Sequence, residues 1–374
     1  MTDKFADIRP YNDEEIPAAM QRIVGSELFP VVANYIYPGE DIEMLRCMFL
    51  KINTIEQFQY NVMYDVYKKI NDNSITQFSY SGFDTMSVDK GYLFVSNHRD
   101  IVLDSLLLQY ALYCNRLPTS EITFGENLMS HPFIVDIGKS NKMFKVFRSG
   151  NMREFMEHSK QLSEYIRDRV VKRDTSIWIA QRNGRTKDGT DITEHGLTKM
   201  LGMSSDRSMQ SYIDLNIKPM AISYEIEPCD AFKTQELYLT KINGKYVKQQ
   251  GEDLQSIVTG ITHSKGRVHL AVASVSPDDF AEYGDINQAH LHKIVAEVID
   301  KKIHANYKLF PNNYIAHDMR SHSNKYGEHY TNEQKEWFVE HYNHSIEALK
   351  GDRDELSSIF LGIYANPVDT AMSE

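Results

Sequence analysis

Apolar positions follow three different patterns along the chain, and each pattern predicts a different kind of structure. Residues 1–73 carry apolar side chains at helical spacing, as at Met20 and Val24. Residues 74–284 carry short apolar runs between polar and glycine-containing stretches, which is typical of strands interleaved with helices. Residues 285–374 return to helical spacing. The sequence therefore predicts a central domain at 74–284 flanked by two helical segments.

The central segment contains apolar runs of strand length separated by helical ones. The candidate strands are Ile75–Tyr80, Tyr92–Ser96, Ile122–Phe124, Ser176–Gln181, Pro219–Tyr224, Glu236–Lys241 and Val268–Val275. The clearest helix runs from Arg153 to Lys172, with Phe155, Ile166 and Val170 on one face. This alternation predicts an α/β fold, a mixed sheet with helices on both faces. Because such sheets bind ligands at the carboxyl ends of their strands, polar motifs that follow strands are the candidate site.

Charge and composition narrow the functional classes. The formal net charge of −11 argues against broad nucleic-acid binding, which needs a basic face. No apolar run is long enough to predict a membrane-spanning helix. The start of the chain lacks the pattern of a signal peptide, and Cys47, Cys114 and Cys229 are far apart. We therefore expect a cytoplasmic protein, with any membrane contact peripheral and on the cytoplasmic face.

The strongest motif runs from Val95 to Leu108, where an apolar strand enters an Asn-His-Arg-Asp turn and an apolar helix follows. A histidine at a strand end can accept a proton from an alcohol near neutral pH. A carboxylate on the other ring nitrogen would orient the imidazole and stabilise its charged form. Asp100 and Asp104 are both candidates for that carboxylate, and His98 and Asp100 also suit a simple turn and helix cap.

This motif resembles the first sequence block of the glycerolipid acyltransferases, an Asn-His or Ser-His followed by four residues and an aspartate. Here five residues separate His98 from Asp104, one more than in the family. Aligning Asp104 with the family's aspartate requires a one-residue bulge and leaves Asp100 to cap the helix. The resemblance then implies that His98 and Asp104 are catalytic and that Asn97 and Arg99 bind substrate.

Three further stretches resemble later blocks of the same family, in the same order. Phe144–Ser149 ends in Arg148 and Ser149, where the family binds the acceptor's phosphate. Ser176–Gly189 is a strand followed by a loop in which the resemblance implies substrate binding by Asn183, Gly184 and Arg185. A guanidinium makes paired contacts with phosphate, and glycine allows an anion to approach backbone amides. Ile217–Glu225 resembles the fourth block, a strand with proline near its start.

One residue departs from the family in the third block. Asn183 stands where the family carries glutamate, so this position keeps its polarity but loses its charge. The change predicts an altered acceptor preference, a reduced activity, or compensation by Gln181 or Glu194.

Other chemistries have little support in the sequence. The pairs His290 with His292 and His341 with His344 lack a third ligand for zinc, so we expect no metal. No glycine loop of the NTPase or dinucleotide type and no Gly-x-Ser-x-Gly elbow is present, and we expect no cofactor.

The resemblance implies an O-acyltransferase. Its expected partners are an acyl thioester donor, either acyl-CoA or acyl-carrier protein, and an acceptor hydroxyl on lysophosphatidic acid. Glycerol 3-phosphate is the alternative acceptor. A catalytically silent lipid-binding protein is the alternative function, because Asn183 and the His98–Asp104 spacing depart from the family.

Overall fold

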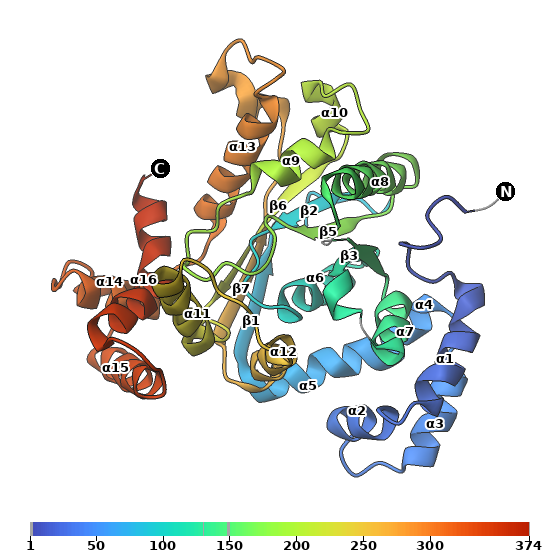
Figure 1. The fold of residues 1–374 in the computed structure, drawn as a ribbon, viewed down its shortest axis with the longest axis horizontal. Helices are drawn as coiled ribbons and strands as arrows, with labels where there is room; N and C mark the ends of the chain where they lie inside the picture. The colour runs from blue at the N-terminus through green and yellow to red at the C-terminus, as the bar shows by residue number, and fades with distance from the viewer. Residues whose placement is uncertain (1–2, 130, 148–149, 374) are drawn as a thin grey trace.

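A seven-stranded mixed sheet is the centre of the computed structural model, which describes residues 3–129, 131–147 and 150–373 (Figure 1). The strands are β1 (Ile75–Ser81), β2 (Leu93–Ser96), β3 (Glu121–Gly125), β4 (Met143–Val146), β5 (Ile177–Ala180), β6 (Ile217–Tyr224) and β7 (Gly266–Val272). Their order is β1-β7-β6-β2-β5-β3-β4. The five strands from β6 to β4 are parallel, whereas β7 runs antiparallel to β6 and β1 runs parallel to β7.

Helices cover both faces of this sheet because its central strands are apolar on both sides. In β2, Leu93 and Val95 pack toward one face and Phe94 toward the other, as the strand period requires. The first face is covered by α8 (Met152–Lys172), α9 (His195–Leu201) and α13 (Leu291–Asn306). The second face is covered by α5 (Tyr64–Ser74) and α6 (Leu103–Cys114). The expected α/β fold with helices on both faces is confirmed.

The N-terminal residues form a helical cluster with its own apolar core. Its helices are η1 (Asp13–Glu15), α1 (Ile16–Gly25), α2 (Phe29–Ile36), α3 (Ile42–Leu50), α4 (Ile55–Phe58) and η2 (Gln59–Met63). Their buried side chains, such as Ile16 and Phe58, meet Phe133 of α7 (Pro132–Ser140). This contact joins the N-terminal cluster to the central domain beside β4.

The C-terminal helices form a second satellite core at the opposite edge of the molecule (Figure 1). They are α14 (Pro311–Arg320), η5 (Gly327–His329), α15 (Asn332–Glu347) and α16 (Arg353–Ser373), and they pack on α11 (Asp230–Asn243). The remaining elements are η3 (Glu126–Leu128), α10 (Met209–Ile213), α12 (Glu252–Thr262) and η4 (Pro277–Tyr283).

Two local predictions are wrong. Glu236–Lys241 was expected as a strand but belongs to α11, whose buried positions Asp230, Lys233, Thr234 and Tyr238 recur at helical spacing. Most of these residues are polar, so the helical period is hidden in a hydrophobicity pattern. Phe155 lies on α8 as expected but is 51% exposed, because the first turns of that helix extend beyond the sheet.

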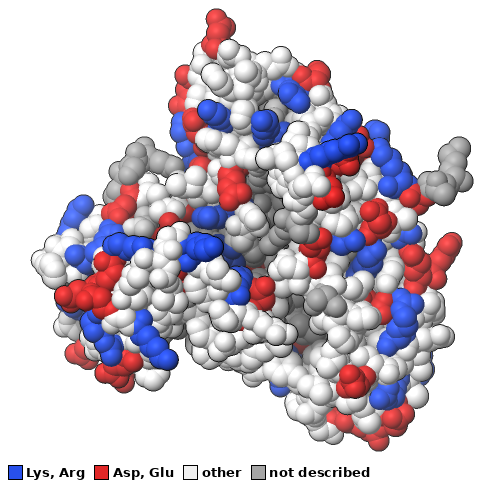
Figure 2. Space-filling view, in the orientation of Figure 1, with Lys and Arg blue, Asp and Glu red and all other residues white. Residues whose placement is uncertain are grey.

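Charged side chains of both signs are mixed over the surface visible in Figure 2. Over the ranges that the structure describes, no helix combines the length and the apolar character needed to cross a bilayer.

The loop at Gly189 fixes the C-terminal helices to the central domain. Gly189 has φ +83°, and a Cβ at this position would lie 2.3 Å from the carbonyl oxygen of Ile363 in α16. Next to it, the side-chain amide of Asn366 donates to the carbonyl of Asp188 at 2.7 Å. Gly189 therefore allows a backbone approach that no other residue type permits.

We expect Gly189→Ala to lower the free energy of unfolding by about 1–3 kcal/mol more than Gly39→Ala, because it adds a steric clash to the backbone strain. Gly39 is the matched control, since its φ is +85° and nothing lies within 4 Å of its added Cβ. Urea denaturation of the two variants measures the difference. Equal losses of unfolding free energy in the two variants would show that the backbone near Ile363 can move to accept the added Cβ without a loss of stability.

Candidate active site

The first motif lies in the turn that joins β2 to α6, at the carboxyl end of the central strand. Asp100 accepts hydrogen bonds through Oδ1 from the backbone N–H groups of Val102 and Leu103, both at 2.9 Å. These are donors at the start of α6 that the helix itself cannot satisfy. Asp100 is therefore the residue that caps the helix.

Asp104 is the carboxylate that contacts His98. Its Oδ2 lies 2.8 Å from Nδ1 of His98 and also accepts the backbone N–H groups of Arg99 and Asp100, at 2.7 and 3.0 Å. Its Oδ1 accepts the hydroxyl of Tyr224 at 2.8 Å. Burial, together with the Asp104 charge, raises the pKa of Tyr224, so this hydroxyl keeps its proton and remains a donor. The carboxylate is held in one orientation, and it orients the imidazole.

His98 opens onto a small pocket of about 80 Å³ at the carboxyl ends of β3 and β5. The pocket is lined by His98, Ile101, Ser105, Ile122, Thr123, Phe124, Gly125, Asn127, Leu128, Met143, Trp178, Ala180, Gly184, Arg185, Lys248 and Asp253. We call this the His98 pocket. The ring of Trp178 meets the imidazole edge to face, with centroids 5.7 Å apart. His98 is 9% exposed, so its Nε2 is the ring nitrogen left to face a substrate.

The third motif brings a cation and a glycine to the same pocket. Gly184 adopts φ +75°, which lets the loop turn back after β5. The backbone N–H of Thr186 donates to the carbonyl of His98 at 2.6 Å and ties this loop to the first motif. Arg185 is 8% exposed and donates through Nη2 to Oγ of Ser256 at 3.1 Å. The loop therefore places a buried positive charge beside the candidate base.

The guanidinium of Arg99 is engaged within the protein, and substrate binding by this residue stays a prediction of the motif. Its guanidinium is fully buried, pairs with Asp191 at 2.5 Å and Glu227 at 3.0 Å, and lies over the ring of Tyr307. Burial alone would lower the pKa of Arg99, but the two carboxylates raise it overall. These contacts use the donors that a substrate would need.

The side chain of Asn97 is also engaged within the protein, and substrate binding by Asn97 likewise stays a prediction. Its side-chain amide donates to Asp191 at 2.9 Å and to the carbonyl of Ile222 at 3.0 Å, and its Oδ1 accepts the N–H of Ile222 at 2.7 Å. The residue is fully buried and joins β2 to β6. It positions the turn that carries His98 rather than contacting the pocket.

The other predicted residues of the site differ in position. Asn183 is exposed and is not among the residues that line the His98 pocket. Arg148 and Ser149 lie outside the described residues. Among the described residues, no group of three or more His, Cys, Asp or Glu side chains is arranged to hold a metal ion.

Several residues of the site had not been singled out from the sequence. Trp178 and Tyr224 lie on the strands of the third and fourth motifs, and it was the neighbouring residues that identified those motifs. Lys248 and Asp253 come from the segment after β6, which resembled no known pattern. In the sequence, Lys248 and Asp253 are distinguished only by their position in the loop and helix that follow the last motif.

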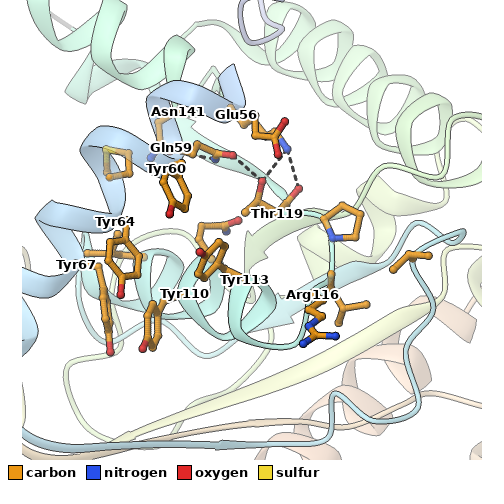
Figure 3. Close-up of a pocket in the computed structure, with 17 residues that line it drawn as sticks. Glu56, Gln59, Tyr60, Tyr64, Tyr67, Tyr110, Tyr113, Arg116, Thr119 and Asn141 are labelled. Atoms are coloured by element: carbon orange, nitrogen blue, oxygen red, sulfur yellow. Dashed lines mark hydrogen bonds between the residues drawn. The ribbon is translucent and has the colours of Figure 1, made fainter. Parts of the chain in front are cut away.

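A second, larger cavity of about 490 Å³ borders α6 (Figure 3). Its wall includes the rings of Tyr60, Tyr64, Tyr67, Tyr110 and Tyr113, and we call it the tyrosine pocket. Leu106 of α6 lines this cavity, whereas the preceding Ser105 lines the His98 pocket. At its polar end, the ammonium of Lys142 donates to Oγ1 of Thr119 at 2.7 Å. The two cavities therefore lie on neighbouring faces of one helix.

The structural place of Arg99 predicts a large loss of stability when it is replaced. We expect Arg99→Met to cost about 3–5 kcal/mol in urea denaturation, because Asp191 and Glu227 would keep their buried charges without that partner. Arg173→Met removes an exposed pair with Asp168 and should cost less than about 1 kcal/mol. Similar small losses in both variants would contradict the structural role of Arg99.

The family comparison agrees with the motifs. A search of curated proteins finds no match. Among solved structures, the chain is similar to the 1-acyl-sn-glycerophosphate (LPA) acyltransferase PlsC from Thermotoga maritima, at 13% identity over 77% of this chain and 93% of that chain, with a TM-score of 0.35. The family model named Acyltransferase matches residues 77–221, which hold His98, Asp104, Gly184 and Arg185. The match covers the central part of the chain, so residues 77–221 are similar to an acyltransferase domain.

Proposed function

We propose that the protein transfers a fatty acyl group from an acyl thioester to a hydroxyl of lysophosphatidic acid, in phospholipid synthesis. The observation that carries this proposal is the contact of His98 Nδ1 with Asp104 Oδ2 at 2.8 Å, at the edge of a pocket that also holds Arg185. A histidine held in this way is a general base for an alcohol. The family match makes acyl transfer the chemistry that such a base would serve.

In this mechanism the acceptor attacks the donor directly. Nε2 of His98 takes the proton of the acceptor hydroxyl while the oxygen attacks the thioester carbonyl. The tetrahedral intermediate then expels the thiolate, which takes the proton back from His98. Asp104 stabilises the imidazolium between these steps, and backbone amides of the Gly184 loop are our candidates for stabilising the oxyanion. Positioning and proton transfer suffice, so no covalent acyl-enzyme is required.

The acceptor's phosphate would bind Arg185, and Arg148 remains a prediction of the sequence motifs. A buried guanidinium attracts a phosphate more strongly than an exposed one, since less solvent screens its charge. The phosphate of glycerol 3-phosphate, the alternative acceptor, would make the same contact with Arg185. Either acyl-CoA or acyl-carrier protein could supply the thioester.

The tyrosine pocket is our candidate for the acyl chain. It begins one residue along α6 from the His98 pocket, and it extends along that helix from Leu106 to Tyr113. That stretch corresponds to about 10 Å of helix. Its aromatic and aliphatic walls would shield a hydrocarbon chain from water while the thioester stays near His98.

We expect His98→Ala to lower the rate of acyl transfer by about 10²–10⁴-fold, because the variant has no base for the hydroxyl. Thiol release from palmitoyl-CoA, with lysophosphatidic acid or glycerol 3-phosphate as acceptor, measures the rate. His263→Ala is the control, since that side chain is exposed and outside the His98 pocket. Near wild-type turnover in His98→Ala would exclude the proposed base.

The same assay tests the alternative of a catalytically silent lipid-binding protein, which Asn183 favours. That alternative predicts binding of lysophosphatidic acid without turnover, unaffected by His98→Ala. Repeating the assay with an acyl-carrier protein as donor separates a silent protein from one that uses a different thioester.

The assignment of the acyl chain predicts a change in chain-length preference. Leu106→Trp would fill part of the tyrosine pocket, so we expect kcat/KM for palmitoyl-CoA to fall about tenfold relative to a shorter acyl-CoA. Leu254→Trp adds the same ring at a position on α12 that is 65% exposed, and it should leave the preference unchanged. An unchanged preference in a folded Leu106→Trp variant would place the chain elsewhere.

A further inference from the structure

The segment between α11 and α12 adds a second cation to the His98 pocket from outside the matched acyltransferase region. Lys248 and Asp253 both line the pocket, although the family match ends at residue 221. The ammonium of Lys248 lies 2.5 Å from Oδ1 of Asp253, whose Oδ2 accepts the side-chain amide of Asn127 at 3.3 Å. A cation is thus tethered at the edge of the pocket that holds Arg185.

Arg185, which lines this pocket, has a donor without a hydrogen-bond partner among the described residues. Its Nη1 is buried and has no hydrogen-bond partner within the described ranges, while Nη2 is held by Ser256. A buried donor without a partner costs about 1–3 kcal/mol, and such groups commonly mark a place where a ligand completes the contact. Because the group is cationic, the missing partner is expected to be an anion.

Lys248 can reach an anion without giving up its own partner. An ammonium carries three donors, and Asp253 takes one of them. The negative charge of Asp253 would repel a bound anion, so Lys248 between the two would also reduce that repulsion. One lysine would therefore neutralise Asp253 and attract the ligand.

The loop that carries Lys248 is bounded by two glycines and has few contacts outside α12. Gly244 and Gly251 bound the loop with φ values of +73° and +92°, and nothing lies within 4 Å of a Cβ added at either one. The side-chain hydrogen bonds found for Tyr246, Lys248 and Gln249 go to α12 or to the loop itself. Rotation at the two glycines could therefore move Lys248 without breaking contacts to the sheet.

We propose that Lys248 is a specificity-determining residue that the loop 244–251 brings onto the phosphate of the acceptor, opposite Nη1 of Arg185. This inference rests on the proposed function for the identity of the acceptor. Two cations around one phosphate would make the site select a phosphate-bearing acceptor over the same lipid without its phosphate. Because Lys248 contributes to acceptor binding and not to proton transfer, its replacement should raise KM and leave kcat nearly unchanged.

Steady-state kinetics of Lys248→Met test this role. We expect KM for lysophosphatidic acid to rise about 10–100-fold with kcat changed by less than about threefold, as for the loss of a charge-assisted contact. KM for monoacylglycerol, which lacks the phosphate, should not change. Lys245→Met lies on the same loop outside the pocket and is the matched control. Equal effects on both acceptors, or in both variants, would overturn the proposal.

A binding measurement separates this inference from the proposed function. Calorimetric titration of glycerol 3-phosphate needs no turnover, and we expect its affinity to fall at least tenfold in Lys248→Met and to stay unchanged in Lys245→Met. If the protein shows no transferase activity but this difference appears, the anion site stands and the transferase proposal fails. Equal affinity in wild-type protein and Lys248→Met would overturn the role of Lys248.

Discussion

The buried charge cluster around Arg99 holds the architecture of the site together. Arg99 follows β2, Asp191 lies in the loop after β5, Glu227 follows β6, and Lys233 comes from α11. The ammonium of Lys233 also donates to the carbonyl of Arg99 at 2.8 Å. Three parts of the chain that are far apart in sequence, at Arg99, Asp191 and 227–233, therefore meet at two cations and two carboxylates, each with a partner of opposite charge. Moving any one of these segments away would leave an unpaired charge in the core, and this cost holds the segments together.

This cluster fixes the backbone on which His98 lies, and Asp104 then fixes the side chain. The N–H groups of Arg99 and Asp100, in the turn that this cluster anchors, donate to Asp104. Tyr224 completes the arrangement from β6. The base is therefore oriented before any substrate arrives, and the reaction need not spend binding energy on arranging it.

The sequence predicted the central elements well because they follow strong periodic patterns. Apolar runs located β2, β5 and β6 to within a few residues, and the polar turns after them hold His98 and Arg185, which line one pocket. The roles of Asn97 and Arg99 could not be predicted, because a polar residue beside a catalytic motif has the same sequence signature whether it faces substrate or core. Their partners Asp191, Glu227 and Tyr307 lie about 90 to 210 residues away. α11 was missed because its buried residues are mostly polar.

The order of the strands also has a consequence for how the chain folds during synthesis. β1 lies at the edge of the sheet, and its neighbour β7 is made roughly 190 residues later. At a translation rate of about 5–20 residues per second, β1 waits on the order of ten seconds or more for its partner. During that time β1 has no neighbouring strand to pair with, and an unpaired strand of this kind can associate with other chains. The newly made chain is thus most exposed to aggregation, and most dependent on chaperones, between the synthesis of β1 and that of β7.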